Sequence, residues 1–188
     1  MAVTTAPVQI PGYVAGTWNV DPVHSDVSFS VRHMMVSKVR GRFTKFEGTI
    51  RTGGDFLASS VEASIDLNSI DTNNEQRDAH IRSADFFEVE KFPTMSFQSR
   101  SIREHGDGYV MDGELTLHGV TRPVELNLEV NGFSKDPYGG MRAGFSASTE
   151  INRKDFGIEF NMPMDGGGVV VGDKIQIALE IEAVLQAS

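Results

Sequence analysis

The five histidines are the side chains best suited to bind a metal ion or to move a proton, and they are scattered along the chain. None lies two or four residues from another, the spacing that would put two imidazoles on one side of a strand or helix. Single histidine ligands from separate loops stay open as an alternative. We predict no metal site and no catalytic group from this set, which comprises His24, His33, His80, His105 and His118.

Two short motifs resemble parts of phosphate-handling enzymes. Asp155-Phe156-Gly157 matches the kinase tripeptide, but no glycine-rich loop, strand lysine or catalytic loop accompanies it. Gly166-Gly167-Gly168 lacks the Lys-Ser/Thr that follows a phosphate-binding loop. We therefore predict a turn at the first motif and a mobile loop at the second.

The one convincing helix carries the best candidates for contacts to a polar head group. Thr72-Asn73-Asn74-Glu75 fits a capping box, and residues 76–83 contain no helix breaker. Its apolar side is thin, which predicts a short surface or lid helix near one end of the fold. Head-group contacts and an ordinary solvated helix face explain its polar residues equally well, and the residues in question are Arg77, Asp78 and His80.

Charge and composition exclude several classes of protein. The 188 residues carry 17 Lys and Arg against 26 Asp and Glu, a formal net charge of −9, which disfavours nucleic acid and anionic membrane surfaces as partners. The absence of cysteine excludes disulfides and thiolate chemistry. The N-terminal sequence has no signal-peptide pattern and no window is apolar enough for a membrane helix, so we expect a cytoplasmic protein without stable membrane insertion.

Alternation of apolar and polar residues dominates the chain and predicts an all-β, mostly antiparallel fold. A change of phase between Phe43 and Phe46 predicts a β-bulge near Thr44-Lys45. Residues 118–123 are expected to form a hairpin turn. The alternating segments cover residues 26–32, 61–68, 94–98, 109–117, 124–131, 141–151 and 174–185.

Neither a repeat nor a linker divides the sequence, so we predict a flexible lead-in over residues 1–15 and one domain over residues 16–188. Several strands are long enough for a tall barrel around a ligand cavity, although a filled β-sandwich has the same alternation. An outer-membrane barrel is disfavoured by the missing signal peptide and by the single Trp and three Tyr.

The predicted inward faces contain no Asp, Glu, His, Lys or Arg, so no buried acid–base pair can be proposed from them. Twelve Phe and eight Met could line an adaptable apolar tunnel or could form an ordinary core. The only ligand that such a lining favours is an apolar one.

Several short motifs stand out by their order and spacing. They are Gly16-Thr17-Trp18-Asn19-Val20-Asp21-Pro22-Val23-His24-Ser25, Val31-Arg32-His33-Met34-Met35-Val36, Val39-Arg40-Gly41-Arg42-Phe43, Asn74-Glu75-Gln76-Arg77-Asp78-Ala79-His80-Ile81-Arg82-Ser83-Ala84-Asp85-Phe86-Phe87, Lys91-Phe92-Pro93, Leu115-Thr116-Leu117-His118-Gly119-Val120-Thr121-Arg122-Pro123-Val124 and Ile151-Asn152-Arg153-Lys154-Asp155-Phe156-Gly157. Together they resemble the YceI-like family, the lipocalin-like polyisoprenoid-binding proteins of bacteria, and the resemblance spans residues 16–185.

This resemblance implies an extended eight-stranded antiparallel lipocalin-like barrel, a short helical segment near one end and a homodimer. It implies a bound isoprenoid lipid, either a polyprenyl chain or an isoprenoid quinone, and no required cofactor. Many relatives carry a secretion signal that this sequence lacks. Apolar positions at the matching motifs give the expected lining: Phe29, Val31, Met34, Phe43, Phe46, Phe86, Phe87, Phe92, Met95, Phe97, Leu115, Leu117, Phe145 and Phe156.

Three hypotheses follow. The first is a non-enzymatic carrier or store for an isoprenoid lipid, with sequestration of hydrophobic antibiotics or other small molecules as a variant that the same cavity would permit. The second is an enzyme that acts on an isoprenoid or quinone at the barrel mouth, with His33, His80 and Asp78 as its candidate groups. The third is an interaction module with a solid core.

Overall fold

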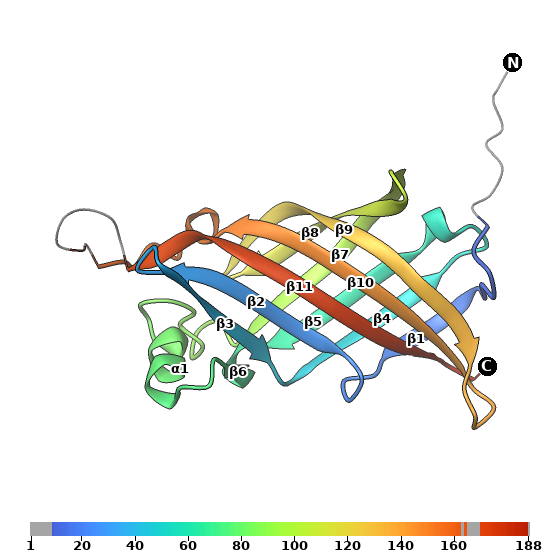
Figure 1. Ribbon diagram of the computed structural model, residues 1–188, viewed down its shortest axis with the longest axis horizontal. Coiled ribbons are helices and arrows are strands. Elements are labelled where there is room, and N and C mark those ends of the chain that lie inside the picture. The colour runs from blue at the N-terminus through green and yellow to red at the C-terminus, as the bar shows by residue number, and fades with distance from the viewer. Residues whose placement is uncertain (1–8, 163, 165–169, 188) are drawn as a thin grey trace, which may run out of the picture.

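In the computed structural model, the chain is described over residues 9–162, 164 and 170–187. One antiparallel sheet curls round until β11 also pairs with β1, which closes an eight-stranded barrel with one short helix, α1, at one end (Figure 1). We call each of the eight strand positions around the barrel a stave, because some of these positions are filled by two strands in line. The predicted mobile loop at Gly166-Gly167-Gly168 lies outside the described residues. The elements are β1 (Gly16–Val20), β2 (Asp26–His33), β3 (Ser37–Phe43), β4 (Phe46–Thr52), β5 (Ser60–Asp66), β6 (Ile70–Asp71), α1 (Glu75–Arg82), β7 (Thr94–His105), β8 (Gly108–Leu117), β9 (Val120–Lys135), β10 (Met141–Asn152) and β11 (Val171–Leu185).

Three neighbouring staves are each built from two strands in line. β1 and β2 both pair with β11, and they pair with β4 and β3 respectively, so these four strands form two interrupted staves. β5 and β6 form a third, because β4 pairs with β5 and β3 with β6. The five remaining staves, β7 to β11, are long single strands joined in chain order. The barrel therefore has one continuous side and one interrupted side.

Thr44-Lys45, where a β-bulge was predicted, is instead a break between two strands, β3 and β4. The backbone N–H of Thr44 donates to the carbonyl of Ser69, and that of Lys45 donates to the Ser69 hydroxyl. Phe43 and Phe46 can therefore both point into the barrel although they are three positions apart, which an unbroken strand forbids.

The turn between β8 and β9 is shorter than the predicted segment 118–123. His118 and Gly119 alone form it, with φ of 56° and 73°, and the register continues through Val120 opposite Leu117. Two consecutive positive φ values match the right-handed twist of a tight hairpin. Arg122 and Pro123, predicted in the turn, lie in the ladder of β9.

The helix also begins later than the capping-box pattern predicts. The N-cap is Asn74, whose side chain accepts a hydrogen bond from the backbone N–H of Arg77, and α1 covers Glu75–Arg82. Thr72 instead donates its hydroxyl and its backbone N–H to the carboxylate of Asp78. Thr72 is thus part of the turn that leads into the helix, and Asn74, also a favoured N-cap residue, takes the cap position.

Packed structure begins before β1. Ile10, Tyr13 and Val14 pack against the apolar cluster around Trp18, and the Tyr13 hydroxyl donates to the carbonyl of Gly53. Of the predicted lead-in, residues 1–8 lie outside the described residues. This aromatic end of the barrel, with β1 and the end of β11, lies opposite the end that carries α1 (Figure 1).

Candidate functional site

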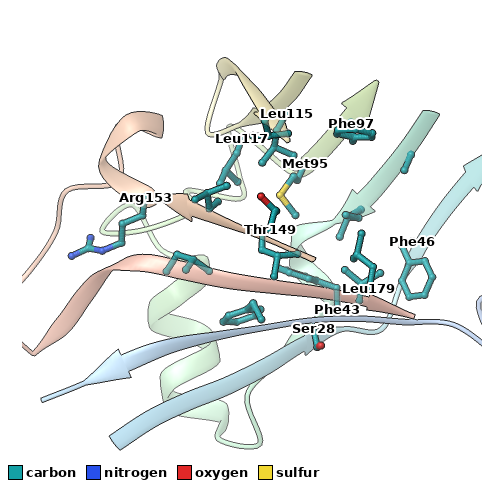
Figure 2. A pocket seen from close by; sticks show the side chains of 18 of the residues that line it. Ser28, Phe43, Phe46, Met95, Phe97, Leu115, Leu117, Thr149, Arg153 and Leu179 are labelled. Carbon is teal, nitrogen blue, oxygen red and sulfur yellow. The ribbon is translucent and has the colours of Figure 1, made fainter. Parts of the chain in front are cut away.

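A cavity of about 640 Å³ occupies the barrel interior. This volume falls within the roughly 300–1,000 Å³ that is usual for small-molecule sites. All eight staves and the segment around α1 contribute to its lining. Figure 2 shows Met95, Leu115 and Leu117 on one side and Phe43 and Leu179 on the other.

Partial exposure of inward-facing side chains distinguishes this cavity from a filled core. On β11 the alternate residues Ile175, Ile177, Leu179 and Ile181 all line the cavity, yet none of them is fully buried. Close packing would bury such side chains completely. The structure therefore answers the question that periodicity left open, because the fold is a closed barrel with accessible apolar surface inside.

Two glycines allow large aromatic rings to lie along the wall. A Cβ on Gly113 would stand 2.4 Å from the ring of Phe97, and a Cβ on Gly41 would stand 2.4 Å from the ring of Phe29. Each ring therefore covers the glycine of the neighbouring strand instead of crossing the cavity. Phe97 packs against both apolar clusters of the protein, so it lies between the two ends of the barrel.

An aromatic plug fills the end of the barrel opposite α1; we use this name for Tyr13, Trp18, Phe56, Tyr109 and Phe133. Trp18 is fully buried, and its ring centroid lies 5.4 Å from that of Phe133 in an edge-to-face arrangement. The Trp18 indole N–H donates to the Thr52 hydroxyl over 2.9 Å. The cavity lining reaches Phe56 but does not include Trp18 or Phe133.

The opposite end is the mouth of the cavity, where α1 meets the barrel. His80, Phe86 and Phe160 all line the cavity, with their ring centroids 5.1 to 5.3 Å apart in edge-to-face pairs. The imidazole Nε2 of His80 lies 2.8 Å from a carboxylate oxygen of Asp85. His80 is therefore placed at the mouth as the head-group hypothesis requires, with one of its nitrogens already paired.

The other two predicted head-group residues are separated by the structure. Arg77 lines the cavity, and its guanidinium donates to the hydroxyl and the carbonyl oxygen of Thr72. Asp78 does not line it, because its buried carboxylate accepts two hydrogen bonds from Thr72. Asp78 therefore lies off the cavity surface, and its carboxylate joins α1 to Thr72, the residue that follows β6.

The residues predicted for the site did not include one buried cation, Arg153. Arg153, at the end of β10, is only 3% exposed and forms part of the lining. Figure 2 shows it at one edge, with its guanidinium directed away from Leu115 and Phe43. Burial lowers the pKa of the guanidinium, and Asp173, with an oxygen 3.7 Å away, opposes this. The Arg153 guanidinium donates to the carbonyl oxygens of Ile158, Phe160, Val171 and Gly172.

Eleven of the fourteen apolar residues predicted to line a tunnel do lie on the cavity surface. These eleven are Phe29, Val31, Phe43, Phe46, Phe86, Phe87, Met95, Phe97, Leu115, Leu117 and Phe145.

Three predicted lining residues lie elsewhere. Met34 is 42% exposed in the turn between β2 and β3. Phe92 packs edge-on against the His118 ring outside the barrel, at 4.9 Å between centroids. Phe156 is fully buried in the 3-10 turn Arg153–Phe156, which agrees with the turn predicted at Asp155-Phe156-Gly157. An apolar residue in a motif does not by itself reveal which way its side chain points.

Ionisable residues do enter the lining, contrary to the prediction from the strand faces. Among the described residues they are Arg32, His33, Glu47, Arg77, His80 and Arg153. Alternation could not reveal most of them, because they come from strand ends and from the α1 segment. The only carboxylate in this set is Glu47, which lies on a different stave from either histidine, and none of the hydrogen bonds or ion pairs described joins it to a histidine. Within the described lining, therefore, no carboxylate is paired with a histidine, and Asp85, the partner of His80, does not line the cavity.

A separate cluster of charges lies at the break between β1 and β2. The ligand atoms of Asp21, His24 and Glu182 lie within 4.8 Å of one another. The Arg142 guanidinium reaches into this group, with its Nη1 2.9 Å from Asp21 Oδ2 and 2.7 Å from Glu182 Oε2. Hydrogen bonds to His24 and Arg142 lower the pKa of Asp21 to about 2. The guanidinium occupies the position between the carboxylates that a metal ion would need.

Comparison with known proteins assigns the family. The model of the YceI-like domain matches residues 18–183, so the chain belongs to the YceI-like family. A UPF0312 protein of Vibrio cholerae serotype O1 is 43% identical over 138 residues, which are 72% of this chain and 73% of that protein. A UPF0312 protein of Pseudomonas aeruginosa is 38% identical over 164 residues, 87% of this chain and 83% of that protein.

Solved structures share the barrel. A Campylobacter jejuni YceI protein superposes with a TM-score of 0.70 at 27% identity, covering 83% of this chain and 90% of that one. BcnA of Burkholderia cenocepacia gives 0.74 at 23% identity, over 87% and 98% of the two chains. A polyisoprenoid-binding domain from Saccharophagus degradans gives 0.69 at 18%, over 92% and 100%. At these last two identities the likeness speaks for the fold alone.

Within the residues that the structure describes, α1 is far too short to cross a bilayer, and no other helix qualifies as a membrane span.

Proposed function

We propose that this protein binds a long isoprenoid lipid, either a polyprenyl chain or an isoprenoid quinone, in the barrel cavity and carries or stores it without chemical change. The observation that carries the proposal is the apolar cavity of about 640 Å³, whose wall along the staves consists mostly of aliphatic and aromatic side chains. A hydrocarbon is the ligand that gains most there, at about 25 cal/mol per Å² of apolar surface buried, before its ordering costs are subtracted.

The shape of the cavity favours a chain over a compact molecule. The lining extends from His80 and Phe160 at the mouth to Phe56 beside the aromatic plug, so a linear ligand can enter tail first. Its head group would then remain among the polar residues of the mouth. A solved neighbour with this fold is a polyisoprenoid-binding domain, which is compatible with the proposal.

An enzymatic role has less support from the site. Arg77 is bonded to Thr72, and His80 is paired with Asp85. Arg153 directs its donors at backbone carbonyls. These three polar groups are thus hydrogen-bonded within the protein, and in the described lining no carboxylate is paired with a histidine. The homodimer implied by the family resemblance stays a prediction, which sedimentation of the purified protein tests.

Native mass spectrometry, followed by organic extraction, tests the proposal. We expect a discrete added mass that extraction identifies as an isoprenoid, or one that forms after incubation with polyprenols and quinones. A protein that stays unliganded after this incubation would contradict the proposal. A hydrophobic antibiotic as the sole ligand accepted would support sequestration instead.

Two variants that place the same charge inside and outside the cavity test where the ligand binds. Phe97→Glu should abolish loading because an ionised carboxylate in an apolar cavity is unfavourable for a hydrocarbon ligand. Gln98→Glu adds the same charge on the exposed face of the same strand and should load normally. Circular dichroism checks that both variants fold. Equal loading of the two folded variants would show that the ligand lies elsewhere.

A further inference from the structure

The turn between β2 and β3 presents apolar side chains to solvent at a place where local structure favours other residues. Met35 and Val36 are 60% and 85% exposed, and Met34 is 42% exposed. Met34 and Met35 have φ of 52° and 62°, the left-handed region that Asn and Gly adopt most readily. Neither the turn geometry nor solubility accounts for methionine here. A strained and exposed apolar pair is a reason to look for a function.

This turn is joined to the mouth of the cavity. The backbone N–H of Met34 donates to the carbonyl of Val170 over 2.7 Å, and that of Val170 donates to the carbonyl of Met162 over 3.1 Å. Met162 and Val170 both line the cavity, yet Met162 is 55% exposed. Met34, Met35, Val36 and Met162, which we call the methionine patch, therefore lie beside the cavity opening.

The hairpin that carries the patch is basic. Its residues, Asp26–Phe43, contain four Lys or Arg and one acidic residue, Asp26, whereas the whole chain has a net charge of −9. The other 170 residues therefore hold 17 − 4 = 13 basic and 26 − 1 = 25 acidic side chains, a net charge of −12. The four cations are Arg32, Lys38, Arg40 and Arg42.

Most of these cations have no carboxylate partner among the described residues. Arg32 and Lys38 are direct cross-strand partners, an unfavourable like-charge pair. Arg42 lies 3.6 Å from Asp71, but no carboxylate among the described residues lies within 4.0 Å of Arg32, Lys38 or Arg40. The neighbouring residues Val31 and Val39 line the cavity, and Lys38 and Arg40 alternate with Val39 on the exposed side.

We propose that the β2–β3 hairpin docks the protein on an anionic lipid bilayer, with the methionine patch in the interfacial layer and the cations against lipid phosphates. A bilayer surface supplies both apolar depth and negative charge, and basic surfaces with apolar anchors bind it in this way. A second copy of this hairpin would bring four further cations instead. Docking here places the cavity mouth at the membrane, where an isoprenoid chain could transfer without crossing water.

The net charge of the rest of the molecule makes this contact oriented and reversible. A chain that carries −12 outside the hairpin is repelled by the same lipids in every other orientation. The attraction should weaken as salt is added, since exposed charges are screened. The purpose of the docking rests on the proposed function, but the docking itself does not depend on a ligand.

Vesicle flotation tests the inference with phosphatidylcholine vesicles alone and mixed with phosphatidylglycerol. We expect binding to the mixed vesicles, which falls with salt, and much weaker binding to the neutral ones. Met34→Asn with Met35→Gly should abolish binding while it leaves the hairpin intact, because this pair suits the turn better. Lys38→Glu with Arg40→Glu should weaken binding about tenfold or more.

Tyr138→Asn is the control, because Tyr138 is 91% exposed in the turn between β9 and β10, away from the mouth. It should float like the natural protein. Equal loss in this control, or no binding of the natural protein to the mixed vesicles, would overturn the inference. So would a variant at Met34 and Met35 that dissociates a dimer in sedimentation and leaves vesicle binding unchanged.

Loading from detergent solution separates this inference from the proposed function. The hairpin variants should take up a polyprenol from detergent as well as the natural protein does, but should take it up from mixed vesicles more slowly. If the natural protein floats with vesicles but never loads, the proposed function fails and the docking stands. If loading from detergent is normal and vesicle binding is absent, the docking fails alone.

Discussion

The two ends of the barrel use the same kinds of apolar residue for different purposes. In the aromatic plug, Trp18 is fully buried and Phe133 is 8% exposed, and the rings meet edge to face. At the mouth, Phe86 and Phe160 meet in a similar way but keep accessible surface. The difference shows that aromatic content alone does not mark a binding site. Residual exposure inside a closed wall distinguishes the ligand-accessible end from the end that holds the fold together.

Truncation of the plug should give the largest change in stability. Trp18→Ala removes a fully buried ring and leaves the Thr52 hydroxyl without its indole donor. We expect the free energy of unfolding to fall by about 3 to 5 kcal/mol. Denaturant unfolding, followed by circular dichroism, measures it.

The matched truncation at the mouth is Phe86→Ala. It should cost about 1 kcal/mol, because the ring is not fully buried in the unliganded protein, and should weaken ligand loading. Equal losses of stability at the two ends would remove the distinction between plug and mouth.

Loss of the buried cation at the mouth should have the next largest effect. Arg153→Ala leaves several backbone carbonyls without donors, and we expect a loss of about 3 kcal/mol in the free energy of unfolding. Lys154→Ala, next to it but exposed, should change stability by less than about 1 kcal/mol. Urea unfolding of both variants measures the difference. A small effect at Arg153 would mean that the mouth does not depend on this arginine for its shape.

A methyl group added to the wall tests how closely the aromatic rings and glycines fit. In Gly113→Ala the new Cβ would stand 2.4 Å from Phe97 and 2.7 Å from the backbone oxygen of Gln98, and we expect a loss of about 1 to 3 kcal/mol. The displaced ring should also narrow the cavity and weaken loading. Gly54→Ala is the control, since nothing lies within 4 Å of its Cβ. Thermal unfolding and loading assays on both variants provide the test. Unchanged stability and loading in Gly113→Ala would show that the wall tolerates the added methyl group.

The smallest effect concerns the charge cluster at the break between β1 and β2. The pKa of Asp21 is lowered to about 2, so its ionised form stabilises the fold above the ordinary carboxyl pKa, and this contribution disappears as the pH falls through about 2. Asp21→Asn should lower stability at neutral pH by less than about 1 kcal/mol. The difference between the two proteins should vanish in strong acid. Denaturant titrations at several pH values provide the test, and a difference that persists at low pH would assign it to packing.

The side-chain period predicted the barrel wall well because one strand residue in two must face the interior. Phe29, Phe97 and Leu115 follow this rule, and all three line the cavity. The change of phase at Thr44-Lys45 also located the break between β3 and β4, although it was interpreted as a bulge within one strand. These features depend on local backbone geometry, which the sequence records directly.

The mouth could not be predicted in the same way. Arg153 lines the cavity because its donors find carbonyls from separate segments, including Ile158 and Gly172. Asp78 turned from a head-group candidate into a structural residue because Thr72 lies beside it in the folded chain. Hydrogen bonds between segments are set by tertiary packing, and a residue's place in a motif does not contain that information.

The interrupted side of the barrel has a consequence for how the chain folds. β7 to β11 pair in chain order, whereas β1 and β2 must find β11 from the other end of the sequence, as in the pairing of Trp18 with Leu185. Contacts between distant residues form late, because loop closure has a high entropic cost. We expect the backbone amides of β8 and β9 to gain protection in pulse-labelled hydrogen exchange before those of β1. The cavity would then come into existence only in the last step of folding.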